Sequence, residues 1–169
     1  MFVLRCTNKL LDKLERPKIT QAEGTEDDWY ANLFRLGRRQ SVIFTHAVSL
    51  YSFIVPHIRK QDLMKTHQVF LLGLEFQLKR DGFPHEHNVE LLERFLDMHI
   101  GKTVNRSTVG SMNDMMNCAK WLAQREGFNV EVDVAKINRI INRTPLKAIG
   151  YKFPIVCFSG LYGLPRSPE

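Results

Sequence analysis

The chain has 169 residues, carries a formal net charge of +6, and is 44% hydrophobic and 25% charged, which is typical of one globular domain. It contains no run of about 18 apolar residues that could cross a membrane, and its first residues lack the cleavage site of a signal peptide. Three cysteines without a C-x-x-C motif indicate a reduced, cytoplasmic protein.

The first 28 residues predict a strand, a short helix and a loop. Phe2–Cys6 is a short apolar run that is typical of a β-strand. Thr7 can cap a helix that continues to about Glu15, and Pro17 ends it. The polar segment Lys18–Asp28 then reads as an exposed loop.

The next segment predicts a β-hairpin followed by a long helix. Asp28–Leu36 fits either a helical turn or a strand. Gln40–Thr45 and Leu50–Val55 are rich in β-branched and aromatic residues, and the short link between them suits an antiparallel pair. Asp62–Lys79 is apolar over a broad face, which predicts a helix packed on one face of that pair.

The second half of the chain is predicted to be mainly helical. The expected elements are a helix opened by Pro84, a strand at Met98–Val104, a helix capped by Ser107, a short strand at Phe128–Val132, a helix capped by Asp133, and an extended segment Lys147–Glu169. This order favours an α+β fold, with a small, largely antiparallel sheet and about four to five helices packed mainly on one face. We expect a single domain over residues 1–154 and an extended C-terminal tail over residues 155–169.

The basic residues are separated from the acidic ones along the sequence. Three stretches, Trp29–Gln61, His99–Asn113 and Val134–Pro168, contain 13 of the 24 lysines and arginines and none of the 18 acidic residues. This segregation predicts a surface of one sign if the stretches meet in space. If they alternate in space, the charges intermix and no such surface forms.

Several groups of residues, taken together, resemble the motifs of a known family. They are Arg5-Cys6-Thr7 with Lys9-Leu10-Leu11, Asp28-Trp29-Tyr30-Ala31-Asn32-Leu33, Arg38-Arg39-Gln40, Gly101-Lys102-Thr103 with Asn105-Arg106-Ser107 and Gly110-Ser111-Met112-Asn113-Asp114, and Asn142-Arg143-Thr144-Pro145 with Gly150-Tyr151. From about Phe2 to Pro154 the chain resembles the DUF6933 domain family, a group of small bacterial proteins. The resemblance implies a soluble bacterial protein in one domain, and it implies no particular activity and no cofactor.

One motif could hold an anion at a turn. Arg38, Arg39 and Gln40 stand directly before a predicted strand. Two adjacent guanidinium groups can hold a phosphate or carboxylate in a fork, and a glutamine can read an amide or a base edge. The alternative is a solvated turn, or one arginine that pairs with Asp27 or Asp28.

A second motif could hold an anion at a helix start. Lys102, Asn105, Arg106 and Ser107 lie where a predicted strand leads into a helix. Free backbone N–H groups and the helix dipole favour negative charge at that end. The alternative is an ordinary serine cap with basic neighbours.

Other side chains are weaker candidates. Trp29 could stack on a base or sugar, although a tryptophan more often belongs to the core. Asn113, like Asn32 and Asn142, could join a polar network. His46 is the histidine that we would test as an acid or base, because it follows a strand close to the arginine pair. No metal site is expected, since histidines two residues apart do not share a helix face.

Three classes of function remain open. The first is a basic binding module for nucleic acid or another polyanion, for which we predict a positive concavity that holds Arg106 with Arg38 or Arg39. The second is a protein-interaction module for an acidic partner. The third is a small phosphate- or nucleotide-directed enzyme such as a nuclease, for which the chain has no catalytic signature.

Overall fold

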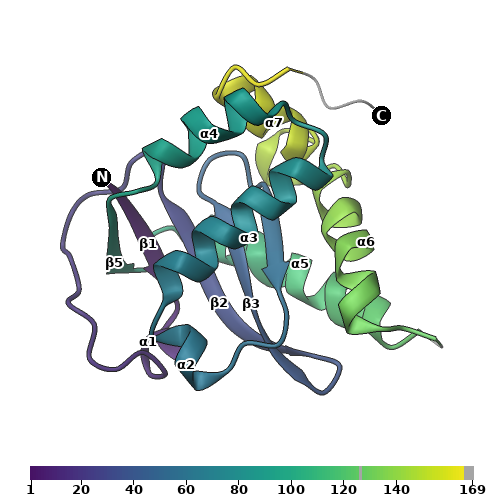
Figure 1. Ribbon diagram of the computed structural model, residues 1–169, viewed down its shortest axis with the longest axis horizontal. Coiled ribbons are helices and arrows are strands. Elements are labelled where there is room, and N and C mark those ends of the chain that lie inside the picture. Colours follow the sequence, from purple (N-terminus) through teal and green to yellow (C-terminus); the bar gives the residue numbers. More distant parts are fainter. Residues whose placement is uncertain (126, 166–169) are drawn as a thin grey trace.

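The protein is built on a five-stranded sheet with helices on both of its faces (Figure 1). The computed structural model describes residues 1–125 and 127–165. The strands are β1 (Phe2–Cys6), β2 (Trp29–Leu36), β3 (Arg39–His46), β4 (Ser52–Val55) and β5 (Met98–Lys102). The helices are α1 (Asn8–Leu11), α2 (Lys60–Leu63), α3 (Thr66–Arg80), α4 (His85–Arg94), α5 (Arg106–Ala123), α6 (Val130–Asn142), the 3-10 turn η1 (Lys147–Ile149) and α7 (Pro154–Leu161).

The sheet has the strand order β4-β3-β2-β1-β5 and combines both pairing directions. β2, β3 and β4 are antiparallel neighbours, and the pairing of Ile43 with Ile54 confirms the predicted hairpin. β1 runs parallel to β2 and β5. Parallel neighbours cannot be joined by a tight turn; here residues 7–28 lead from β1 to β2, and α2, α3 and α4 precede β5. The α+β class is confirmed, with a mixed sheet in place of a largely antiparallel one.

Apolar side chains cover both faces of the sheet. Trp29 belongs to one core cluster and its neighbour Tyr30 to the other, because successive side chains of a strand point to opposite faces. α3, α4 and α7 pack on the Trp29 face together with α1 and α2, and α5 and α6 pack on the Tyr30 face. Figure 1 shows α3 in front of the sheet and α5 behind it. The helices thus lie on both faces, and not mainly on one, because strands that are apolar on both sides need cover on both.

The predicted long helix over Asp62–Lys79 forms as two pieces. α2 ends at Leu63 and α3 begins at Thr66. Gly73 lets α3 lie close to the sheet, since a Cβ atom at this position would stand 2.7 Å from a ring carbon of Phe53. A glycine in the middle of this helix is therefore explained by packing, despite its poor helix propensity.

The start of α6 also differs from the expectation. The segment Phe128–Val132, expected as a short strand, leads into a helix that begins at Val130. Asp133 lies inside the first turn of this helix, and its carboxylate accepts a hydrogen bond from the Asn129 N–H at 2.6 Å. The aspartate therefore stabilises the helix start from within the first turn, and not from the cap position in front of it.

The end of the chain is not an extended tail in its described part. Pro154–Leu161 form α7, with Pro154 in the first turn, where its missing N–H costs nothing. Phe158 is fully buried and stacks on Tyr51 with ring centroids 4.3 Å apart. The segment expected over residues 155–169 therefore contributes a helix to the core, because its apolar side chains have a face of the sheet to cover.

Two asparagines of α6 close the free edge of β4. Asn142 accepts a hydrogen bond from the Ser52 N–H at 2.8 Å and donates one to the Ser52 carbonyl oxygen at 2.7 Å. Asn138 makes the same two contacts with Ile54, at 2.9 and 3.4 Å. Residues four apart on a helix share a face, and residues two apart on a strand share an edge. Each side-chain amide therefore takes the place that the peptide group of a neighbouring strand would take.

Candidate functional site

A group of arginines surrounds the turn between β2 and β3. An open hollow of about 520 Å³ lies between this turn and the segment that follows β4. We call it the arginine hollow, and its lining residues are Arg35, Arg38, Arg39, Gln40, His57, Ile58 and Arg59. It includes all three residues of the predicted turn motif, and its lining contains no acidic side chain among the residues that the structure describes.

The turn is as short as an antiparallel pair allows. Leu36 pairs with Arg39, so that only Gly37 and Arg38 form the turn. Gly37 has a φ of +62°, a left-handed conformation that glycine adopts without strain and that hairpin turns require. Leu36 is fully buried beside the turn, whereas Arg38 and Arg39 are exposed. The base of the hairpin is therefore fixed in the core, and its tip presents two guanidinium groups to solvent.

The second wall of the hollow is tied to the hairpin through the backbone. The Ile58 N–H donates a hydrogen bond to the Gln40 carbonyl oxygen at 2.9 Å, and the Ile58 side chain is buried. His57 has a φ of +60°, which is uncommon for a residue with a Cβ atom. Its Nε2 is buried and finds no hydrogen-bond partner among the described residues. Backbone geometry thus brings Arg59 next to the arginines of the hairpin.

Most guanidinium groups of the arginine hollow have no ion-pair partner. The Arg59 Nε lies 3.4 Å from the Asp62 carboxylate, and a hydrogen bond from the Arg59 N–H lowers the pKa of Asp62. In the described part of the chain, none of the ion pairs involves Arg35, Arg38 or Arg39. Like charges that lie close together repel, so an anion in the hollow would stabilise this arrangement.

A second open hollow adjoins the first at Gln40, which lines both. Its other lining residues are Asp12, Lys13, Leu14, Glu15, Arg16, Lys60 and Leu63. Lys60 is already engaged, because its Nζ lies 3.4 Å from the Glu15 carboxylate. Lys13 and Arg16 add basic side chains next to the arginine hollow, although the carboxylates of Asp12 and Glu15 line this second hollow with them. We call the basic residues of the two hollows the basic end, and they are Lys13, Arg16, Arg35, Arg38, Arg39, Arg59 and Lys60.

Sequence reasoning missed Arg35, His57 and Arg59 as members of this site. All three belong to the acid-free stretch Trp29–Gln61, so the composition carried a signal. The hydrogen bond between residues 58 and 40 is what brings the two ends of that stretch together. That contact can be foreseen only once the register of β3 and β4 is known.

The predicted anion site at Lys102–Ser107 lies at the other end of β2. At the start of α5, the Asn105 N–H donates a hydrogen bond to the Tyr30 hydroxyl at 3.1 Å. Tyr30 is six residues from the turn end of β2, which corresponds to about 20 Å of strand. The structure therefore does not bring this helix start to the Arg38–Arg39 pair. The prediction of one concavity that holds Arg106 with Arg38 or Arg39 is wrong.

The cap of α5 is Asn105 and not Ser107. The Asn105 Oδ1 accepts hydrogen bonds from the N–H groups of Ser107 and Thr108, at 2.9 and 3.1 Å. Asparagine and serine cap helices equally well, and the contact with Tyr30 decides between them here. The side chains of Lys102 and Arg106 are exposed on either side of this cap.

Trp29 is a core residue and cannot reach a ligand. It is fully buried, and its ring packs edge-on against a set of five other rings. These belong to His46, Phe53, Phe70, Phe95 and Phe158. The alternative that places this tryptophan in the core is therefore the one that the structure supports.

His46 is buried and distant from the arginine pair. It ends β3, whereas Arg39 begins it, so seven residues or about 23 Å of strand separate them. Burial lowers the pKa of His46 to about 4. The His46 Nδ1 accepts a hydrogen bond from the Ser49 N–H at 3.2 Å, and its Nε2 lies 2.8 Å from the Tyr162 hydroxyl. That hydroxyl donates to Asp27 at 2.8 Å, so the imidazole belongs to a structural hydrogen-bond chain.

The three asparagines with a predicted network role have different environments. Asn32 accepts a hydrogen bond from the Thr7 hydroxyl at 2.7 Å, and Asn142 closes the edge of β4. Asn113 is exposed on α5. Two of the three therefore stabilise the fold, and none lines either of the two hollows.

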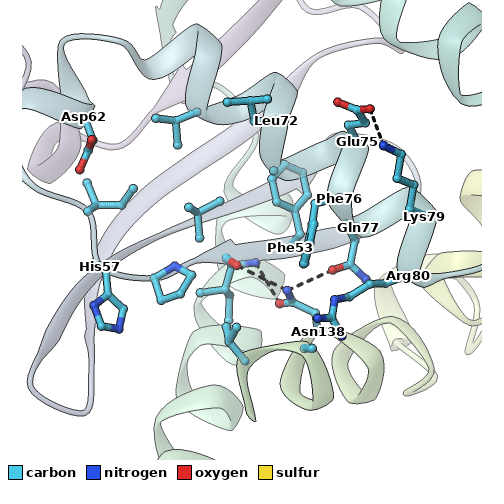
Figure 2. A pocket seen from close by; sticks show the side chains of 18 residues that line it. Phe53, His57, Asp62, Leu72, Glu75, Phe76, Gln77, Lys79, Arg80 and Asn138 are labelled. Carbon is cyan, nitrogen blue, oxygen red and sulfur yellow. Dashed lines mark hydrogen bonds and ion pairs between the residues drawn. The ribbon is translucent and has the colours of Figure 1, made fainter. Parts of the chain in front are cut away.

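A groove over β4 offers apolar surface more than free charge (Figure 2). It lies between α3 and α6, and the exposed ring of Phe76 forms part of its wall. Four of its polar side chains pair with each other, as the Lys79 Nζ lies 2.7 Å from Glu75 and the Asn138 amide donates to Gln77 at 3.1 Å. The arginine hollow is therefore the better candidate for binding an anion.

Residues that carry the family resemblance are also found in the interior. The Arg5 Nε donates to the Asp28 carboxylate at 3.0 Å, and both side chains are almost fully buried. Asp28 also accepts a hydrogen bond from the Val3 N–H at 3.0 Å. Gly101 leaves room for this pair, because a Cβ atom there would stand 3.1 Å from the Arg5 Nη1. These motif residues therefore stabilise the fold, whereas the Arg38-Arg39-Gln40 motif lines a surface hollow.

A comparison with known proteins finds one family. A family model described as a domain of unknown function (DUF6933) matches residues 3–156. Neither the curated proteins nor the solved structures include a significant match. Among the described residues, every helix is too short or too polar to span a bilayer, and no three His, Cys, Asp or Glu side chains gather as they would around a metal ion.

Proposed function

The chain belongs to the DUF6933 family, and because the description of that family assigns no activity, we propose a function from the basic end. The protein is a binding module for nucleic acid, which it contacts mainly through phosphate groups. The observation that carries this proposal is the arginine hollow, where four arginines line one cavity and no acidic side chain among the described residues lines it with them.

The chemistry of the arginine hollow suits phosphate. A guanidinium group presents donors in a planar fork that matches two oxygens of a phosphate. Arg38 and Arg39 are exposed and without an ion pair among the described residues, so binding would not first have to break an internal contact. A nucleic acid offers phosphates at regular intervals, and several arginines can engage it at once with release of counter-ions.

We place this activity in the bacterial cytoplasm. The three cysteines Cys6, Cys118 and Cys157 are free thiols. Free thiols are typical of proteins in a reducing compartment. The cytoplasm is also where a bacterial protein meets nucleic acid.

Binding of a labelled duplex, followed by fluorescence anisotropy, tests the proposal. The natural protein should bind a duplex of about 20 base pairs in the micromolar range, with an affinity that falls steeply between about 50 and 200 mM salt. Arg38→Gln combined with Arg39→Gln should weaken this binding by about tenfold or more at the lower salt concentration.

A second double variant controls for net charge. Lys102→Gln combined with Arg106→Gln also removes two positive charges, one at the end of β5 and one at the start of α5, far from the hairpin turn. It should leave the affinity within about twofold of the natural protein. The proposal is wrong if no binding occurs at low salt, or if both double variants lose affinity equally.

A further inference from the structure

We propose that the basic end binds double-stranded nucleic acid in preference to single strands; this inference rests on the proposed function and specifies its ligand. It follows from three features of the site: the types of side chain in its two hollows, the defined backbone of its hairpin, and the gathering of basic side chains around the narrow tip of that hairpin.

The two hollows lack the platform that single strands need. Proteins that hold single strands stack the bases on aromatic side chains, each worth about 1–3 kcal/mol. His57 supplies the one aromatic ring among the described residues that line the two hollows. Other exposed rings, which belong to Phe76, Trp121, Tyr151 and Phe153, line neither hollow. The site can therefore grip phosphates but offers little to unstacked bases.

The arginines of the hairpin are held by a rigid backbone. The two-residue turn at Gly37, the buried Leu36 and the hydrogen bond from Ile58 to Gln40 define the position of both walls. Charges that start from a defined backbone match a duplex, whose phosphates are already ordered. A flexible single strand must lose conformational entropy to present its phosphates in the same arrangement.

The hairpin is also narrow enough to reach two phosphate rows. Paired strands lie about 4.8 Å apart, whereas the major groove of a DNA duplex is about 12 Å wide. Arg35 and Gln40 form a cross-strand pair behind the tip, and Gln40 joins the arginine hollow to the hollow that contains Lys13. The basic side chains of the two adjoining hollows thus lie around this end of the hairpin, and a duplex groove offers a row of phosphates on each side of an inserted tip.

The experiment compares a duplex of about 20 base pairs with single strands of about 40 nucleotides, so that the number of phosphates is equal. Anisotropy titrations at several salt concentrations should show duplex binding tighter by about tenfold, with a steeper salt dependence for each phosphate contacted. Arg38→Gln with Arg39→Gln should reduce the duplex-to-single-strand ratio toward one. Lys102→Gln with Arg106→Gln should leave that ratio unchanged.

The outcomes separate this inference from the proposed function. If single strands bind as tightly as the duplex or more tightly, the duplex preference is wrong and nucleic-acid binding stands. If Arg38→Gln with Arg39→Gln weakens binding of both ligands by the same factor, the contact of the hairpin with two phosphate rows is wrong, and nucleic-acid binding again stands. If neither ligand binds at low salt, the proposed function itself is overturned.

Discussion

At the scale of single residues, burial decides the chemistry of His46. Removal from water lowers the pKa of its imidazole to about 4, although the nearby carboxylates of Asp27 and Asp28 act in the opposite direction. The ring is therefore neutral near pH 7. A neutral Nδ1 can accept the hydrogen bond from the Ser49 N–H, and protonation of that nitrogen would abolish it.

Acidification should consequently destabilise the fold through His46. The imidazole pKa is about 4 in the folded protein against a usual value of 6.5, so the unfolded chain binds the proton first as the pH falls. The free energy of unfolding should decrease from about pH 6.5 down to about pH 4, by up to about 3 kcal/mol. Urea denaturation at about pH 7 and pH 4.5 measures this, with His46→Gln as the reference. The variant should lose less stability than the natural protein over that interval, and equal losses would contradict the prediction.

At the scale of helices and strands, contacts from neighbouring elements decide where an element begins. Ser107 and Asn105 are both acceptable caps for α5. The Tyr30 hydroxyl of β2 accepts the hydrogen bond of the Asn105 N–H, and Asn105 then caps the helix through its side chain. The helix start is therefore determined by the sheet as well as by the local sequence.

The cap makes a prediction that distinguishes the two residues. Asn105→Ala should lower the free energy of unfolding by about 1 kcal/mol, because the N–H groups of Ser107 and Thr108 lose their acceptor. Ser107→Ala should change it by less than about 0.5 kcal/mol, as expected for an exposed position outside the cap. The urea midpoints of the two variants give the comparison, and the reverse order would restore serine as the cap.

Local patterns in the sequence predict the helices and strands themselves better than they predict which of these elements lie side by side. The strand at Phe2–Cys6 and the antiparallel pair β3–β4 follow from apolar runs and a short link. The parallel pairing of Leu4 with Ile100 joins residues that are far apart in the chain, and no local pattern encodes it. The sequence predicts α5 and α6 as helices, but it does not assign the face of the sheet that they cover, since that depends on the strand pairing.

The sequence predicts only part of the candidate site, because the rest depends on contacts between residues that are far apart in the chain. Arg38 and Arg39 stand out because they are adjacent and precede a strand. Arg59 joins them only through the backbone contact of Ile58 with Gln40. The sequence predicts Arg106 beside these arginines, but the length of β2 separates the start of α5 from the turn.

At the scale of the whole molecule, α7 connects the end of the chain to its first half. Phe158 packs against Trp29 and Tyr51, and the Tyr162 hydroxyl donates to Asp27. The family match ends at residue 156, before Phe158 and Tyr162. The domain of this protein therefore extends beyond the matched residues, and its core is complete only with the last helix.

Truncating the buried ring of α7 should show how much the core depends on this helix. Phe158→Ala should cost about 3–5 kcal/mol of unfolding free energy, because it leaves a cavity between the rings of Trp29 and Tyr51. Val156→Ala, on the exposed side of the same helix with 56% of its surface accessible, should stay within about 0.5 kcal/mol. Chemical denaturation measures both, and similar losses for the two variants would show that α7 is not part of the core.

The two asparagines of α6 also cover the edge at which another molecule could add a strand. An edge strand with free N–H and C=O groups is a template on which another molecule can add a strand and start a fibril. Here Asn138 and Asn142 occupy those groups on β4, and Pro56, the next residue after the strand, has no N–H to offer. Copies that gather side by side along one polymer reach a high local concentration, where such templating is fastest. The paired amides therefore remove this template from β4, including where copies bound along one nucleic acid, as proposed above, would be crowded together.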